Sequence, residues 1–377
     1  MAPSQPLRLD TAAFLARHWQ REPLLIRQAV VNFQPPLSAD ELAGLAMEEE
    51  VESRIIDYDD ARYQLSHGPF SAEDFSRQGP WTLLVQAVDR HLPAVDGLLD
   101  LVDFIPRWRV DDIMISYAVD GGGVGPHYDN YDVFLLQAEG KRRWRVGQGC
   151  DSSTPLQRHD DLRLLAEFDC SADYILEPGD ILYLPPGVAH WGTAIGESMT
   201  YSLGFRAPRV SAMVSRWADR LLERIDPDVF YRDPNSSPAL RAGEIRPEDR
   251  YRAREQLLAA LGRADDTAWF GEVLTEDGAV SPLAPEADAV VLNQTAGGNS
   301  CVARYPGARI AWQEDGEDIL VFANGEQAHF KEAVLPHLMT LCSGGSLAWT
   351  GTPGKNGQAD SDPLIGFLLR CGCLCVE

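Results

Sequence analysis

The sequence predicts an α+β protein of several domains, built around a β jelly roll. Its 377 residues exceed the usual length of one domain. Between residues 101 and 207, short β-rich runs alternate with glycine and proline turns, whereas the residues on either side carry helical patterns. Many short strands separated by turn signals are typical of a sandwich or a barrel, and a jelly roll fits their number.

The composition is that of an ordinary globular protein, with 45% hydrophobic and 24% charged residues. The opening MAPSQPLRLD has no apolar run behind a basic start, and later apolar stretches such as LLVQAV are too short to cross a bilayer. We therefore expect a cytoplasmic protein without a membrane partner.

The net charge of −24 argues against the basic surface that sequence-independent nucleic-acid binding needs. It favours a basic partner, although an acidic surface can also serve solubility alone. No direct binding of nucleic acid is expected.

The seven cysteines form an odd set without a C-x-x-C pair, which favours free thiols in a reducing compartment over a disulfide framework. Cys371, Cys373 and Cys375 alternate in the closing CGCLC, so a strand would place them on one face. Small buried core residues are the simpler interpretation, and a metal or redox role is the alternative.

Residues 1–100 are predicted to be mainly helical and to buttress the jelly roll. Ser38 precedes Glu41 by three residues and Ser71 precedes Asp74 by three, which is the spacing of a capping box at a helix start.

The predicted jelly roll covers residues 101–207 and holds the strand-like runs DIMISYAV, YDVFLLQA, KRRWRVG, ADYILEP, DILYLPP and MTYSLGF. The Glu139-Gly140 step between the second and third runs predicts the turn of a β-hairpin.

Residues 208–265 are predicted to form a helical module that pairs with a second copy of itself. Its first helix carries apolar residues at helical spacing, and DRYRAREQLLAALG is the second helix. The apolar positions are Val210, Val214, Trp217, Leu221 and Ile225. Residues 266–377 mix helix and strand.

The stretch GPHYDNYDVF places His127 and Asp129 one residue apart, so an extended backbone presents both side chains on one face. His190 follows a Pro-Pro-Gly turn in LEPGDILYLPPGVAHWG and supplies a third ligand. Two histidines and one carboxylate form the facial triad of non-haem Fe(II) oxygenases. An H-x-D pair alone is weak evidence, but this combination in strand-rich sequence favours a metal site.

Alternation along the predicted hairpin turns Val133, Leu135 and Gln137 inward, and then Arg142, Trp144 and Val146. An arginine among apolar neighbours needs an anion, and the distal carboxylate of 2-oxoglutarate would satisfy it. Ser116 is placed to bind the same carboxylate, although a serine that merely fills the sheet is an equal alternative. Arg143 and Arg145 should face solvent.

Other ligand motifs fail on inspection. GGGVGP lacks the last glycine of a dinucleotide-binding loop, and TPGKNG lacks the Ser or Thr of a phosphate-binding loop. Signatures of zinc hydrolases and deaminases are absent as well.

The HYD motif, Arg142 at thirteen residues beyond Asp129, and PPGVAH resemble the JmjC-type, cupin-fold 2-oxoglutarate oxygenases. Further segments resemble the bacterial ribosomal oxygenases, which hydroxylate an arginine of a ribosomal protein. The likeness covers nearly all of residues 10–245, and its segments include REPLLIRQAVVNF, SHGPF, DDIMISYAVDGGGVGPH, YDVFLLQAEGKRRWRVG and YSLGFRAP.

This resemblance implies that Fe(II), 2-oxoglutarate and O2 are the reactants, and that an arginine of large-subunit ribosomal protein sixteen is hydroxylated at C3. It implies a homodimer formed through the helices after Pro208, and a C-terminal winged-helix-like domain. An acidic surface would then steer in a basic ribosomal protein.

The resemblance also implies residue roles. His127, Asp129 and His190 match the iron ligands, while Arg142 and Ser116 match the cosubstrate contacts. Thr200 stands where an asparagine near the chelating end of the cosubstrate is expected.

Asp120 and Gln137 are interpreted as substrate contacts. Two alternatives stay open: a catalytically silent cupin that binds a ribosomal protein, and an oxygenase that modifies histidine or a small molecule. The complete triad favours the enzyme over the silent cupin.

Overall fold

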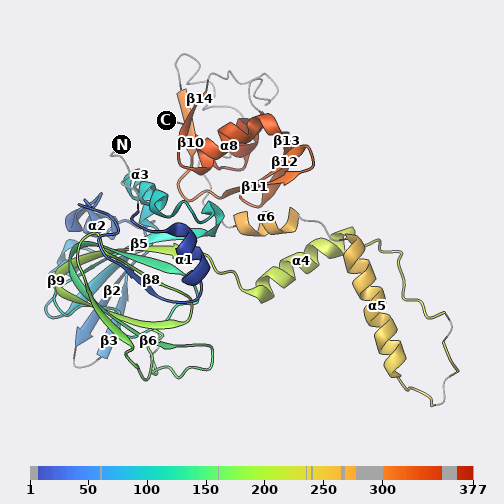
Figure 1. The fold of residues 1–377 in the computed structure, drawn as a ribbon, viewed down its shortest axis with the longest axis horizontal. Helices are drawn as coiled ribbons and strands as arrows, with labels where there is room; N and C mark the ends of the chain where they lie inside the picture. Colours follow the sequence, from blue (N-terminus) through green and yellow to red (C-terminus); the bar gives the residue numbers. More distant parts are fainter. Residues whose placement is uncertain are drawn as a thin grey trace.

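A computed structural model describes residues 7–59, 62–159, 161–234, 236–238, 241–264, 268–276, 300–349 and 363–376. Figure 1 shows a β-rich body, an arm made of two helices, and a C-terminal domain that lies next to the body. Within these residues, no helix is both long and apolar enough to span a membrane.

The body is one antiparallel nine-stranded sheet that curls around a cavity (Figure 1). Its order is β1 (Leu24–Ile26), β8 (Ile181–Leu184), β6 (Val133–Gly149), β9 (Val188–Phe205), β5 (Val110–Ala118), β4 (Trp81–Val85), β2 (Ser53–Asp59) and β3 (Arg62–His67), with β7 (Ala172–Leu176) also paired to β6. The two longest strands, β6 and β9, pair along most of their length and form the backbone of the expected jelly roll.

The expectation that residues 1–100 are mainly helical is wrong. Four of the nine strands, β1 to β4, come from this segment and extend the sheet at two edges. Its helices are short: α1 (Thr11–Arg17), α2 (Ala39–Leu45), α3 (Pro93–Asp96), and the 3-10 turns η1 (Ala72–Phe75), η2 (Val88–Arg90), η3 (Gly97–Val102) and η4 (Arg107–Arg109). All five residues of β4, WTLLV, are buried, so this strand lacks the alternation that marks a half-exposed strand.

Both predicted capping boxes are confirmed. The Ser38 hydroxyl accepts from the backbone N–H of Glu41 at the start of α2, and the Glu41 carboxylate accepts from the Ser38 N–H. Ser71 and Asp74 form the same arrangement, but it opens only the 3-10 turn η1.

The predicted hairpin at Glu139-Gly140 is also wrong, because β6 runs unbroken from Val133 to Gly149. The chain bulges there instead: the register with β9 shifts on either side of Glu139, and Gly140 has φ +62°. A Cβ on Gly140 would lie 1.9 Å from the Glu197 carbonyl oxygen, so only glycine fits. Because the bulge adds one residue, side chains at even-numbered positions after it face the side that odd-numbered positions face before it.

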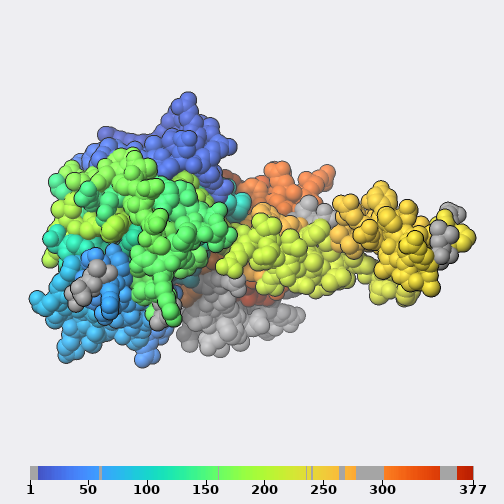
Figure 2. Space-filling model, turned by 90° about the horizontal axis from the view of Figure 1, so that it is seen from below, coloured from blue at the N-terminus to red at the C-terminus, as the bar shows by residue number. Residues whose placement is uncertain are grey.

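The arm consists of α4 (Val210–Arg224) and α5 (Pro247–Ala264), which confirms both predicted helices. Figure 2 shows it projecting from the rest of the molecule. Next come α6 (Ala268–Thr275) and two three-stranded sheets, β11 (Ile310–Asp315) to β13 (Glu326–Lys331) through β12 (Asp318–Ala323), and β14 (Ser346–Trp349), β10 (Ser300–Arg304) and β15 (Leu374–Val376). The 3-10 turn η5 (Glu332–Val334) and helices α8 (Leu335–Cys342) and α9 (Pro363–Arg370) complete this domain.

All seven cysteines are free thiols. Cys373 is fully buried in the C-terminal core, and burial raises the pKa of its thiol, whereas Cys371 and Cys375 are half-buried. Of Cys371, Cys373 and Cys375, only Cys375 lies on a strand, so the three do not alternate along one strand face.

Candidate metal centre and its pocket

His127, Asp129 and His190 meet at one point of the sheet interior. One ligand atom from each lies within 4.8 Å of the others, and His190 Nε2 is 3.5 Å from Asp129 Oδ2. His190 lies on β9, but the H-x-D pair lies in the extended segment before β6 rather than on a strand. Two backbone hydrogen bonds between His127 and His190, of 3.0 and 2.8 Å, fix that segment to β9.

Both histidines present the nitrogen that a metal needs. The Nδ1 atom of His127 is 2.9 Å from the Gly125 carbonyl oxygen, and that of His190 is 2.9 Å from the Val188 carbonyl oxygen. A carbonyl only accepts, so each Nδ1 carries the proton and each Nε2 keeps its lone pair free. Burial, with a smaller contribution from His127, lowers the pKa of His190 to about 4, which keeps the ring neutral at physiological pH. The donor set therefore fits Fe(II) with positions left open.

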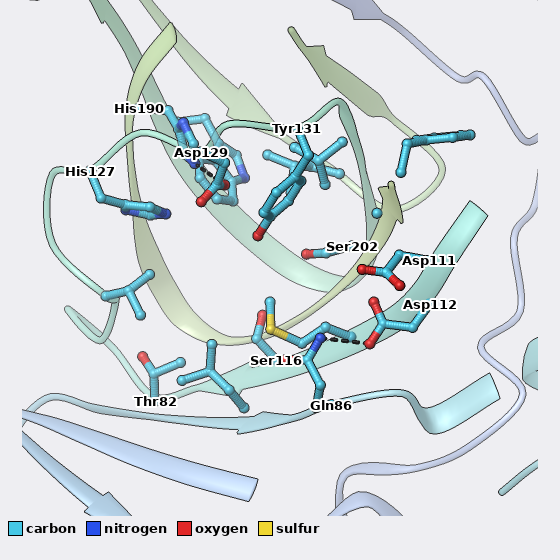
Figure 3. Close-up of a pocket in the computed structure, with 18 of the residues that line it drawn as sticks. Thr82, Gln86, Asp111, Asp112, Ser116, His127, Asp129, Tyr131, His190 and Ser202 are labelled. Atoms are coloured by element: carbon cyan, nitrogen blue, oxygen red, sulfur yellow. Dashed lines mark hydrogen bonds and ion pairs between the residues drawn. The ribbon is translucent and has the colours of Figure 1, made fainter. Parts of the chain in front are cut away.

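The triad opens into a cavity of about 210 Å³ (Figure 3). Its walls include Val133 and Leu135 from one half of β6 and Arg142 and Trp144 from the other half. These odd and even positions share one interior because the bulge at Gly140 shifts the phase of the strand between them.

Arg142 is the cation of this cavity. The residue is 3% exposed, and its guanidinium donates to the Ser116 hydroxyl at 2.9 Å and to the Thr200 hydroxyl at 3.2 Å. Among the described residues it forms no ion pair, and burial alone lowers its pKa to about 10. A buried guanidinium that stays charged at neutral pH, with two hydroxyls and the Trp144 ring as its neighbours, fits the carboxylate of a ligand.

Thr200 and Gln137 form a second layer behind that guanidinium. The Thr200 hydroxyl donates to the Gln137 side-chain oxygen at 3.1 Å, and the Gln137 amide donates to two backbone carbonyls. Gln137 is fully buried and does not line the cavity, so the structure does not bring it to a substrate. Thr200 lies beside Arg142, at the end of the pocket that suits the distal carboxylate.

Asp120 is likewise not brought to the pocket. Its carboxylate accepts from the Gly196 backbone N–H at 2.7 Å in a surface turn. Arg143 and Arg145 face away from the cavity, as predicted: Arg143 pairs with Asp173 at 2.9 Å, and Arg145 stacks on Trp191 with 3.5 Å between its Cζ and the ring centroid.

The sequence did not reveal the acidic side of the cavity. Asp111 and Asp112 both line it, although neighbours on a regular strand face opposite ways (Figure 3). The register of β5 with β9 skips Asp111, pairing Val110 with Phe205 and Asp112 with Gly204. This bulge turns two consecutive carboxylates to one side.

Asp112 is 7% exposed. One of its oxygens accepts from the Gln86 amide at 2.6 Å and from the Ala87 backbone N–H at 3.0 Å. Its other oxygen has no hydrogen-bond partner among the described residues. Burial raises the pKa of Asp112, and the neighbouring charge of Asp111 raises it further. The ring of Tyr131, 42% exposed, stands between this carboxylate pair and Asp129 (Figure 3).

Comparisons with known proteins agree with this geometry. Two family models match the chain: a JmjC domain over residues 97–213 and a ROXA-like winged helix over residues 256–369. They confirm the expected jelly-roll core and the winged-helix expectation for the C-terminal part.

Among curated proteins, the ribosomal protein uL16 3-hydroxylase of Escherichia coli K12 is 39% identical over 325 residues, which cover 85% of this chain and 86% of that protein. A probable ribosomal oxygenase of Haemophilus influenzae is 33% identical over 268 residues, which cover 69% of this chain and 66% of that protein.

Solved structures give the same result. An X-ray structure of E. coli ycfD has a TM-score of 0.81 at 36% identity and covers 98% of this chain and 99% of its own. A structure of YcfD described as a ribosomal oxygenase, in complex with cobalt and 2-oxoglutarate, has a TM-score of 0.77 at 36% identity and covers 99% of both chains. This chain therefore belongs to the JmjC-domain family of ribosomal oxygenases, which use a metal and 2-oxoglutarate.

Proposed function

We propose that this chain hydroxylates C3 of an arginine side chain in a large-subunit ribosomal protein, with Fe(II), 2-oxoglutarate and O2 as reactants. One observation carries the proposal: a single cavity holds the His-Asp-His triad, an unpaired guanidinium and a pair of carboxylates. The first two features suit the metal and the cosubstrate, and the third suits a cationic side chain.

His127, Asp129 and His190 would hold Fe(II), and Arg142 with Ser116 would hold the distal carboxylate of 2-oxoglutarate. When bound, these reactants supply an oxidation in which 2-oxoglutarate becomes succinate and CO2, one oxygen atom of O2 enters succinate, and the other replaces a C–H by C–OH. The chain itself contributes position: the Thr200 hydroxyl, which is held by Gln137, orients the Arg142 guanidinium, and the carbonyl oxygens of Gly125 and Val188 orient the two imidazoles.

Arginine is favoured as the substrate because of Asp111 and Asp112. The free oxygen of Asp112 lies in a mostly buried wall, where a fork of N–H donors forms strong charge-assisted hydrogen bonds. The exposed ring of Tyr131 offers a flat face for the apolar stem or the planar guanidinium. A histidine ring donates at most one N–H in a given direction and an apolar side chain donates none, so neither matches this carboxylate as a guanidinium fork does.

The relative in E. coli is named for action on uL16, and ribosomal proteins carry the basic charge that an acidic chain attracts. The net charge of −24 would raise the encounter rate with such a partner and make it sensitive to salt. We therefore infer that the partner is the uL16 counterpart in the same cell.

The test is in vitro hydroxylation. Full-length protein with Fe(II) and 2-oxoglutarate is given peptides of that uL16, and mass spectrometry with fragmentation locates an added oxygen. We expect it on C3 of one arginine, no product when citrulline replaces that arginine, and no product from His127→Ala, Asp129→Ala or His190→Ala protein, which should also lose bound iron. Modification of a histidine instead, or tight binding of uL16 without any product, would favour the two alternatives.

We also infer that the chain is a homodimer joined through its arm. Large apolar side chains on α4, on α5 and on the segment between them are half to three-quarters exposed, among them Val210, Val214, Leu222, Phe230, Ile245, Tyr251 and Leu257. A soluble monomer rarely exposes so many large apolar side chains on one projecting part. The arm projects from the rest of the molecule, and α4 packs on α6 at its base, so a second arm is the partner that would cover both of its helices (Figure 2).

A further inference from the structure

Asp111 lies where two domains and two cavities meet. It lines the catalytic cavity, and it also lines a smaller cavity between the body and the C-terminal domain. One oxygen of its carboxylate is 3.4 Å from an Nη atom of Arg309, which belongs to the C-terminal domain just before β11. The C-terminal domain therefore places a cation at the rim of the catalytic pocket.

Arg309 is itself well fixed. It is 17% exposed, and its other Nη atom donates to the carbonyl oxygen of Glu276 at 2.6 Å, just past α6. Its backbone is held as well, because the Asn324 side chain accepts from the Arg309 N–H and the Asn324 N–H donates to the Arg309 carbonyl. Asp111, in contrast, has a half-exposed side chain on a bulge, so without a partner it would sample several rotamers.

The surrounding contacts make the two domains one unit at this point. Trp108, three residues before Asp111, packs edge-on against Phe270 of α6 and against the buried cluster of β11 and β12. Arg206, which follows β9, donates to the Leu274 carbonyl of α6. Outside the catalytic cavity, one Nη atom of Arg304 donates to both carboxylate oxygens of Asp96, at 2.9 and 3.1 Å.

The charges form an alternating row. Arg309 is positive, Asp111 and Asp112 are negative, and a substrate guanidinium between the two carboxylates would be positive. With Arg309 present, the carboxylate pair carries one net negative charge, which one guanidinium neutralises. Without Arg309, two like charges would share the pocket wall with no cation from the C-terminal domain beside them, and the charge of Asp111 raises the pKa of Asp112.

We propose that Arg309 is a positioning residue for substrate recognition: through its ion pair it aims the Asp111 carboxylate so that Asp111 and Asp112 together receive the guanidinium of the substrate arginine. This gives the C-terminal domain a part in specificity. The inference rests on the proposed arginine substrate, and it does not involve the binding of iron or 2-oxoglutarate.

The test compares Arg309→Gln, Arg309→Lys and the matched control Arg304→Gln in the full chain. Arg304→Gln removes a better-buried ion pair of the same interface that does not touch the catalytic cavity. Peptide affinity is measured by calorimetry with Mn(II) and 2-oxoglutarate in place of the active iron complex, and KM and kcat are measured separately with Fe(II). Thermal unfolding of each variant reports damage to the interface.

Arg309→Gln should raise Kd and KM for the arginine peptide by about three- to tenfold, as expected for a partly exposed ion pair, with kcat and the KM for 2-oxoglutarate nearly unchanged. Arg309→Lys should restore most of the peptide affinity. Asp111→Asn should weaken peptide binding too, and adding Arg309→Gln to it should cost little more.

Three results would overturn the inference. An Arg309→Gln protein with unchanged or tighter peptide binding would show that Arg309 only repels the substrate or does nothing. An equal loss in Arg304→Gln would assign the effect to domain docking in general. A wild-type protein that neither binds nor modifies the arginine peptide would overturn both this inference and the proposed function, whereas the first two results leave the proposed function standing.

Discussion

At the scale of single residues, the catalytic cavity contains two buried charges of opposite sign. Arg142 is 3% exposed and Asp112 is 7% exposed, and among the described residues neither forms an ion pair. Burial lowers the pKa of Arg142 and raises that of Asp112, so in each case it favours the neutral form. Both charges are costly in the free protein, so a ligand of opposite charge beside either one would stabilise the site.

Arg142→Ala should raise the 2-oxoglutarate requirement by one to two powers of ten, because a charge-assisted hydrogen bond contributes roughly 1.5–3 kcal/mol. Arg142→Lys should be partly active, since an ammonium supplies charge without the fork. The control is Arg143→Ala, whose side chain pairs with Asp173 outside the cavity. Succinate release measured at increasing 2-oxoglutarate concentration tests all three variants. A large rise in the 2-oxoglutarate requirement of Arg143→Ala would contradict the assignment of Arg142, rather than Arg143, to the cavity.

Asp112 should make peptide use sensitive to pH. Its ionised form binds a guanidinium much more strongly than its protonated form does, because the hydrogen bond is then charge-assisted on both sides. Burial raises the pKa of Asp112, so kcat/KM for the peptide should begin to fall at a pH above the usual carboxyl range of about 4 as the solution is acidified. Asp112→Asn should lower kcat/KM about tenfold or more and remove this dependence. A pH profile that is identical in wild-type and Asp112→Asn protein would contradict this role.

At the scale of elements, two bulges on neighbouring strands shape the site. The bulge of β6 at Gly140 brings Arg142 and Trp144 to the interior that Val133 and Leu135 already line. The bulge of β5 at Asp111 turns the carboxylate pair inward. Bulges are common beside active sites because one extra residue re-aims every side chain that follows.

Gly192 on β9 leaves space for the Trp144 ring, which lines the cavity together with His190 and Arg142. It pairs with Trp144 across the strands, and a Cβ there would lie 2.8 Å from the indole ring. The ring has little space to move, because it lies 5.9 Å from the His190 ring and 5.6 Å from the Arg142 Cζ. Gly192→Ala should therefore cost about 1–3 kcal/mol of unfolding free energy and raise the KM for 2-oxoglutarate.

Urea unfolding and 2-oxoglutarate titration measure both effects. Gly149→Ala is the control, since that glycine lies on β6 with nothing within 4 Å of an added Cβ. It should change the unfolding free energy by no more than about 0.5 kcal/mol. Equal behaviour of the two variants would mean that Trp144 does not hold the pocket wall.

At the scale of the whole molecule, α6 connects all three parts. Arg220 of the arm pairs with Glu272 of α6, and Arg216 pairs with Glu276 just after it. Helix α6 packs in turn on the C-terminal strands β11 and β12. The arm is thus fixed at its base while its apolar side chains remain exposed. This arrangement favours association of two rigid arms.

Light scattering at micromolar concentration should give the mass of two chains. Leu222→Glu, at a position 69% exposed on α4, should shift the mass toward that of one chain, because a buried charge at an apolar interface is strongly unfavourable. Met339→Glu is the control: it is 59% exposed, but it lies on α8 in the C-terminal domain, and it should leave the mass unchanged. A monomeric wild-type protein would refute the dimer.

The sequence by itself determined the features that are local in the chain. The H-x-D pair, the histidine after Pro-Pro-Gly, both capping boxes and the two arm helices all follow from residue types at short spacing, and the structure has each of them. Arg142 was also predicted to face inward, but for a wrong reason, since no hairpin turn precedes it.

Only the tertiary structure decided which side chains of β5 and β6 face the cavity, and therefore which residues line the side proposed for the substrate. A bulge exists because a distant strand skips one residue in its hydrogen-bond register, and no local pattern records that skip. For this reason the sequence does not point to Asp111, Asp112 and Tyr131, which line the cavity. The two substrate contacts that it does predict, Asp120 and Gln137, lie outside the cavity lining. The fully buried β4 was missed for a related reason, because neighbours on both of its faces remove the alternation by which a strand is recognised.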